Sequence, residues 1–264
     1  MINNYTRSQI IFLLSGSFVF AYCFGIVIHE LGHVLAYLYY GVSTDVFVIH
    51  PFGRNYMEPA VDITHGKLLI GASGSLFNVF CAVSFSFLFR HTKNIYFMPF
   101  LMWGATSLIQ EAIAMILDIV KGSQFDWSIV IATGIPIWIV ICLSISFLLI
   151  GSLYFLRLMA FAGLSKSDSY AKILSVCLGS VIPFFLFALI YSSLYQETMI
   201  FSKTIPLISS IILSLLLSMS FRPTFDYLEK ILPNKKISTI GWKHIAFSCG
   251  LALVIILTGL LYFN

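Results

Sequence analysis

Long apolar stretches alternate with short polar ones along the whole chain. A membrane-spanning helix needs about 20 mostly apolar residues. The sequence offers that length several times, and the short polar segments between carry nearly all of the Lys and Arg residues. Seven apolar stretches predict membrane-spanning helices, at roughly 9–40, 67–90, 95–120, 127–157, 171–195, 204–221 and 243–262. We therefore expect an all-α polytopic membrane protein with about seven transmembrane helices.

The segment 41–66, between the first two expected helices, has a different pattern. An apolar run at 46–49 is followed by the turn-forming residues Pro51 and Gly53, and a second run of mixed polarity follows at 60–63. Short apolar runs on either side of turn residues are typical of a β-hairpin. The pattern predicts a short β-hairpin between helices 1 and 2.

Composition agrees with a membrane location. Apolar residues make up 59% and charged residues 10% of the chain, and the mean hydropathy is +0.96; these values lie outside the range of soluble proteins. The formal charge of +4 is spread over loops, so we expect a lipid bilayer and no nucleic acid as partner. All five cysteines lie in apolar stretches without CxxC spacing, which predicts neither disulfides nor a thiolate zinc site.

The distribution of positive charge orients the expected helices. The N-terminus and the second-to-third, fourth-to-fifth and sixth-to-seventh connections together hold 11 of the 15 Lys and Arg residues. Cytoplasmic loops are enriched in these residues. The count predicts an integral, multi-pass protein of the cell membrane with its N-terminus in the cytoplasm. The apolar run after Arg7 exceeds 30 residues, so we expect the first helix to remain in the mature protein.

The first expected helix contains the sequence His29-Glu30-Leu31-Gly32-His33. Two histidines four positions apart lie on one face of a helix, so both imidazoles can reach one metal ion. In this motif the histidines bind Zn²⁺ and the glutamate acts as general base for hydrolysis. The alternative is a chance match whose polar residues only pack between helices. Ionisable groups are costly at membrane depth and usually mark a functional site, which favours metal binding.

A His-Glu-x-x-His motif on a membrane-spanning helix of a polytopic chain resembles the site-2 protease family of intramembrane zinc metalloproteases. The segment 73–78, Ser-Gly-Ser-Leu-Phe-Asn, is similar to the family's A-G-P-L-x-N segment; Gly74 and Asn78 match, and Ser75 replaces the proline. The resemblance implies that Asn78, with Gly74, binds the substrate backbone near the metal. The alternative for Asn78 is a hydrogen bond between helices.

The resemblance also implies a third metal ligand, an aspartate in an N-x-x-P-x-x-x-L-D-G segment. The best counterpart begins at Asp118 and places Asp126 at the ligand position. The proline is absent, Phe125 replaces leucine, and Trp127 replaces glycine. Asp126 is thus the expected third ligand, and its alternative role is that of an N-terminal helix residue without a metal.

Two further acidic residues lie on the third expected helix. Glu111 and Asp118 are seven positions apart and share a face. Buried carboxylates need a partner, so both are alternative ligands or groups that hydrogen-bond a metal-bound histidine. Asp118 is the reserve choice for the third ligand.

The resemblance covers roughly residues 20–135. It implies a metalloprotease core at 1–157, containing helices 1 to 4, and accessory transmembrane helices 5 to 7 at 158–264. The expected activity is that of a zinc metalloendopeptidase cutting a membrane-embedded or membrane-associated protein or peptide, with regulation by the substrate or a membrane partner. The rival hypothesis is a non-proteolytic ion-binding carrier or pseudo-protease scaffold, against which the intact Glu30 argues.

Two predictions disagree about the side of the membrane. The charge distribution puts His29 and His33 in the outer half of the first helix, whereas the family generally places its zinc toward the cytoplasm. Either this chain cuts nearer the outer face or one expected span is misplaced.

Overall fold

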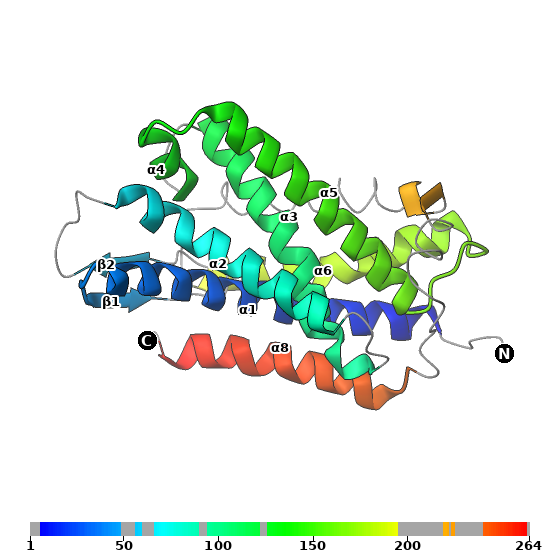
Figure 1. The fold of residues 1–264 in the computed structure, drawn as a ribbon. Helices are drawn as coiled ribbons and strands as arrows, with labels where there is room; N and C mark the ends of the chain where they lie inside the picture. The colour runs from blue at the N-terminus through cyan, green and yellow to red at the C-terminus, as the bar shows by residue number, and fades with distance from the viewer. Residues whose placement is uncertain are drawn as a thin grey trace.

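The computed structural model describes residues 6–48, 56–59, 66–89, 94–121, 126–194, 219–221, 223–224 and 240–262. The described part is mainly helical (Figure 1). Its elements, in chain order, are α1 (Arg7–Tyr39), β1 (Thr44–Val48), β2 (Tyr56–Pro59), α2 (Lys67–Leu88), the 3₁₀ turn η1 (Ile95–Phe97), α3 (Met98–Lys121), α4 (Asp126–Ala132), α5 (Ile137–Phe161), α6 (Tyr170–Leu194) and α8 (Trp242–Tyr262).

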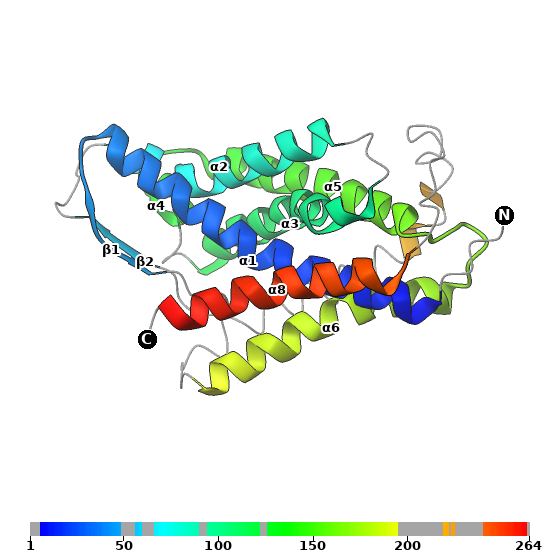
Figure 2. The same cartoon turned by 90° about the horizontal axis from the view of Figure 1, so that it is seen from below.

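Helix α1 is the central element of the bundle. It begins with a capping box, in which the Thr6 side chain accepts a hydrogen bond from the Gln9 backbone N–H and the Gln9 side chain accepts one from the Thr6 N–H. It then packs against α2, α3, α6 and α8, which surround it in both views (Figures 1 and 2). A helix that is apolar on nearly all sides suits this central position.

Four helices of the described part are long and apolar enough to cross a membrane: Arg7–Tyr39, Lys67–Leu88, Ile95–Val120 and Ile137–Phe161. Shorter apolar helical stretches occur in α6 and α8, at Tyr170–Ile182 and Trp242–Leu257. These lengths and compositions are those of a membrane protein. The expected span at 204–221 lies almost wholly outside the described residues.

The single helix predicted at 127–157 is wrong, because the chain forms α4 and α5 with a break between them. Thr133 and Gly134 form a turn, and Gly134 has φ +97°, a left-handed conformation that costs glycine little. Pro136 then stands at the N-cap of α5 with extended backbone angles. Proline disfavours a helical conformation in the residue before it and lacks an N–H to continue a helix. The break lets α4 pack against α2.

A strand pair lies in the segment where the hairpin was predicted. β1 and β2 are antiparallel, with Val46 opposite Glu58 and Val48 opposite Tyr56. The first strand overlaps the predicted run at 46–49. The connection at 49–55 and the predicted second run at 60–63 lie outside the described residues.

Candidate metal centre

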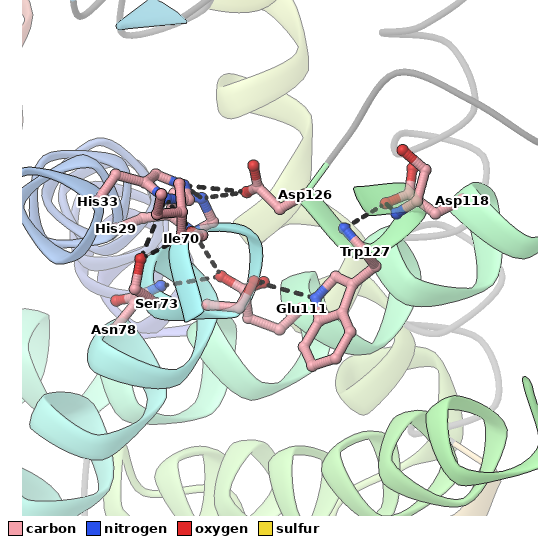
Figure 3. Close-up of polar contacts among 11 residues, drawn as sticks. His29, His33, Ile70, Ser73, Asn78, Glu111, Asp118, Asp126 and Trp127 are labelled. Atoms are coloured by element: carbon pink, nitrogen blue, oxygen red, sulfur yellow. Dashed lines mark hydrogen bonds and ion pairs between the residues drawn. The ribbon is translucent and has the colours of Figure 1, made fainter. Parts of the chain in front are cut away.

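Three side chains that could bind a metal ion come from two helices and converge toward one end of the bundle. His29 and His33 come from α1, and Asp126 is the first residue of α4. The Oδ2 atom of Asp126 lies 2.8 Å from Nε2 of His29 and 3.2 Å from Nε2 of His33, and the two Nε2 atoms are 3.2 Å apart. Figure 3 shows the Asp126 carboxylate directed at both imidazoles. The structure thus brings together the three ligands predicted from the sequence, in a group that could hold a metal ion.

The other ring nitrogen of each histidine is already bonded. Nδ1 of His29 lies 3.0 Å from Oε1 of Glu111, and Nδ1 of His33 lies 2.8 Å from the backbone oxygen of Ile70. A carboxylate and a carbonyl are acceptors, so each Nδ1 donates its proton and each neutral ring presents a lone pair at Nε2. Two lone pairs facing one another at 3.2 Å repel unless a cation or a proton lies between them. This tautomer assignment follows from the partners and suits metal ligation.

The spacing of the three donor atoms fits Zn²⁺. Zinc binds histidine nitrogen and carboxylate oxygen at about 2.0–2.2 Å in tetrahedral sites, which places neighbouring ligand atoms about 3.3 Å apart. The observed separations among the donor atoms of His29, His33 and Asp126 run from 2.8 to 3.2 Å. Catalytic zinc sites use three protein ligands and keep the fourth position for water or substrate. The residues present therefore fit a catalytic zinc site.

Glu30 lies beside this group on α1. Its side chain is buried, and it is near enough to both histidines and to Asp126 to interact with them electrostatically. A buried carboxylate beside candidate metal ligands is a candidate general base for hydrolysis. The structure thus puts the predicted catalytic residue next to the predicted ligands.

Asp126 is held as a carboxylate. Burial by itself would raise the pKa of its carboxyl group, but when the rings carry a second proton at Nε2 in place of a metal ion, hydrogen bonds from His29 and His33 and the charges of these rings outweigh that cost. The result is a pKa well below the ordinary value of an aspartate. The ionised form is the one that binds metal.

Glu111 stands behind His29 and is held by several donors. Ser75 Oγ donates to its Oε2 at 2.5 Å, and Asn78 Nδ2 donates to its Oε1 at 3.3 Å. Carboxylates that accept the distal N–H of a metal-binding histidine fix the ring orientation and raise its basicity. Of the two roles left open for Glu111 by the sequence, the structure supports that of a partner of a metal-binding histidine.

Two departures from the family segments contact one another. Ser75 stands where the family has proline and Trp127 where it has glycine, and Trp127 Nε1 donates to Ser75 Oγ at 3.0 Å. Ser75 donates in turn to Glu111, which accepts from His29. A chain of hydrogen bonds thus connects α4 to the imidazole of His29 through α2 and α3. Ser75 and Trp127 were not predicted as members of the site, although each places a side chain with a hydrogen-bonding group where the family segment has none.

Asp118 does not join the histidines. Its Oδ2 atom accepts hydrogen bonds from the backbone N–H groups of Trp127 at 2.9 Å and Ser128 at 3.1 Å. Figure 3 shows it directed toward Trp127 and away from His29 and His33. The structure therefore brings Asp126, and not the reserve Asp118, to the metal centre. Asp118 instead satisfies N–H groups in the first turn of α4, the turn that carries Asp126.

Gly74 lies where α2 passes closest to the histidines. A Cβ atom built on Gly74 would collide with Nε2 of His33 and lie 2.7 Å from Nε2 of His29. A side chain at this position would therefore occupy space beside the donor atoms of the candidate metal centre. Contact of Gly74 with the substrate stays a prediction. The structure adds a separate reason for glycine at position 74, because any side chain there would collide with the histidines.

Asn78 is buried and bonded between helices. Besides donating to Glu111, it accepts hydrogen bonds at Oδ1 from Trp103 Nε1 at 2.9 Å and from Ser107 Oγ at 3.2 Å. These are the contacts expected of the alternative interpretation, in which Asn78 connects helices. Its role in substrate binding stays a prediction.

Two further groups near His33 were not predicted from the sequence. They are the backbone oxygen of Ile70 and the side chain of Ser73, whose Oγ atom lies 3.3 Å from Nδ1 of His33.

Comparisons with family models, curated proteins and solved structures found no match.

Proposed function

We propose that this chain is a multi-pass zinc metalloendopeptidase of the cell membrane, similar to the site-2 protease family. The observation that carries the proposal is the convergence of the His29, His33 and Asp126 donor atoms within 4.8 Å of one another. Their location within the apolar helix α1 and at the start of α4, with Glu30 alongside, favours hydrolysis over storage or transport of an ion. A carrier or a pseudo-protease scaffold would have no use for Glu30.

Each residue has a defined part in the proposed reaction. His29, His33 and Asp126 would hold Zn²⁺, with Glu111 orienting His29 and the Ile70 carbonyl orienting His33. Bound zinc supplies a Lewis acid and lowers the pKa of water from about 15.7 to about 7.

Glu30 takes one proton from the attacking water and passes it to the leaving nitrogen. The water oxygen forms a bond to the carbonyl carbon and the C–N bond breaks. One water molecule is consumed, and the products are a carboxylic acid and an amine, which become a carboxylate and an ammonium group when the acid proton passes to the amine.

The proposed substrate is a membrane-embedded or membrane-associated protein or peptide. A substrate helix has its backbone groups bonded internally, so it must unwind before water can reach a peptide bond. An extended segment could then pair with the edge of the β1–β2 strands.

The proposed protein has seven membrane spans, and β1 and β2 form a hairpin between the first two. The helices at 158–264 have an accessory role. The substrate or a membrane partner regulates the activity.

Metal analysis and a cleavage assay test the proposal together. Wild type, His33→Ala and Glu30→Gln would be purified in detergent and assayed for zinc content and for cleavage of a panel of single-span model peptides. His244→Ala is a matched control, since His244 lies at the start of α8 and accepts a hydrogen bond from the Gly241 N–H.

We expect zinc in wild type, Glu30→Gln and His244→Ala but not in His33→Ala, and cleavage only by wild type and His244→Ala. Zinc binding without cleavage of any peptide would favour the carrier or scaffold. Cleavage that survives in Glu30→Gln would contradict the assigned mechanism.

A further inference from the structure

The two ends of the helical bundle differ in charge. One end holds the starts of α1, α3, α6 and α8 and the ends of α2 and α5, and the opposite end holds α4 and the strands (Figures 1 and 2). Of the seven Lys and Arg residues in the described part of the chain, five belong to segments at the first end and two, Lys67 and Lys121, begin or end helices at the second. The five are Arg7, Arg157, Lys166, Lys172 and Lys243.

The metal centre lies toward the charge-poor end. His33 and His29 precede the last residue of α1, Tyr39, by six and ten positions, which at 1.5 Å per residue is about 9 and 15 Å. The start of α1 at Arg7 is about 33 Å from His29 by the same measure. Asp126 begins α4, which lies at this same end (Figure 1). The site thus lies inside the bundle, about 9 to 15 Å along α1 from its last residue. It is in the half of the bundle that carries little positive charge.

The three side chains are also partly exposed. The side chain of Asp126 is 31% exposed, that of His29 18% and that of His33 10%.

Cytoplasmic ends of membrane helices are enriched in Lys and Arg, so the charge-rich end belongs in the cytoplasm. The metal centre then belongs in the outer half of the membrane.

We infer that the active site opens toward the extracytoplasmic side, and that the substrate is a membrane-anchored polypeptide cut in the outer-leaflet part of its membrane segment. The inference rests on the proposed function for its substrate and on the charge distribution for its direction. Cleavage at that depth releases the extracytoplasmic portion of the substrate outward, and leaves the cytoplasmic portion in the membrane.

Cysteine labelling tests the direction without any need for activity. Two exposed serines offer a matched pair: Ser43 follows α1 at the end with the metal centre, and Ser167 lies between α5 and α6 at the charge-rich end. Ser43→Cys and Ser167→Cys would each be made in a chain whose five cysteines are replaced by alanine. Intact cells would then be treated with a membrane-impermeant maleimide.

We expect labelling of Ser43→Cys in intact cells, and labelling of Ser167→Cys only after permeabilisation. Labelling of Ser167→Cys alone, or of both variants in intact cells, would overturn the inference. If either variant is absent from the membrane on immunoblotting, Val42→Cys and Ser169→Cys probe the same two segments.

A pair of reporter peptides tests the substrate class. Both would contain one apolar span of identical composition in the same orientation, with an unwinding Asn-Pro pair placed near its outer end in one and near its inner end in the other. We expect cleavage of the first and loss of cleavage in the second, with the new terminus located by mass spectrometry. Cleavage of the inner-end peptide alone would overturn the inference yet support the proposed function. Cleavage of neither, with the expected labelling, would contradict the proposed function and leave the measured orientation standing.

Discussion

The Nδ1 atom of His29 lies 3.0 Å from Oε1 of Glu111, although 82 positions separate the two residues in the chain. The contact joins α1 to α3 and leaves Nε2 of His29 facing His33 and Asp126. It fixes the ring orientation on which the proposed metal binding depends.

Glu111→Gln should therefore weaken zinc binding while leaving all three ligands in place. Loss of such a histidine partner typically costs about 10- to 100-fold in metal affinity. Competition titration with a zinc-binding dye would measure the change. Asp168→Asn is a suitable control, because Asp168, in the segment before α6, pairs with Lys172 in the first turn of α6, away from the centre. Equal zinc affinity in wild type and Glu111→Gln would show that the negative charge of Glu111 does not strengthen metal binding by His29.

Trp127→Phe should also weaken zinc binding, because Trp127 is hydrogen-bonded to Glu111 through Ser75. The change removes the N–H that bonds Ser75, which in turn bonds Glu111. Residues in one hydrogen-bond network show non-additive effects. Zinc affinity should therefore fall in Trp127→Phe, and the same change in a Glu111→Gln background should have little further effect. Trp242→Phe, in the exposed first turn of α8, is the matched control. Fully additive effects would mean that Trp127 acts on the centre by another route.

Asp118→Ala should disturb the metal centre although Asp118 is not a ligand. The substitution leaves the N–H groups of Trp127 and Ser128 without their acceptor. Loss of a helix-end acceptor costs about 1 kcal/mol. Because Asp126 stands in the same turn, zinc affinity should fall together with thermal stability. Asp168→Ala removes a comparable acceptor, that of the Ser165 N–H, and should lower stability without affecting zinc. A zinc affinity unchanged in Asp118→Ala would contradict this account of α4.

Gly74→Ala should abolish zinc binding. The added methyl group would occupy the space beside Nε2 of both histidines, 2.7 Å from that of His29. Gly25→Ala, on α1, is the control, because its Cβ would meet Ser107 and Trp103 at 3.5 Å, an ordinary van der Waals distance. Zinc stoichiometry and the melting temperature of both variants would be compared. A Gly74→Ala protein that binds one zinc with wild-type affinity would show that α2 can move away from the centre.

The sequence was sufficient to predict the parts of the site that depend on local periodicity. His29 and His33 share a helix face because they are four positions apart, and the apolar stretches around them predicted that helix. Asp126 was predicted only from the resemblance, and the structure places it at the histidines. The choice between Asp126 and Asp118 could not be made from helix periodicity, since it depends on how α4 folds back against α2.

The break between α4 and α5 had a signal in the sequence, namely Gly134 and Pro136. Both residues lie in an apolar stretch, so the hydrophobic pattern hid the turn. The contacts of Ser75 and Trp127 had a weaker signal, because each is only a departure from a family segment. The hydrogen bond between Ser75 and Trp127 forms only because α2 packs against α4. Neither residue by itself indicates that packing. For the same reason the sequence left the role of Glu111 open.

X-ray absorption at the zinc edge tests the proposed metal centre most directly. We expect one zinc per chain, bound by nitrogen and oxygen at about 2.0–2.2 Å with the outer-shell scattering of imidazole, and loss of this zinc in His33→Ala. A sulfur ligand at about 2.3 Å would point to the cysteines instead. That result, or purified wild type that binds no zinc, would contradict a centre built from His29, His33 and Asp126.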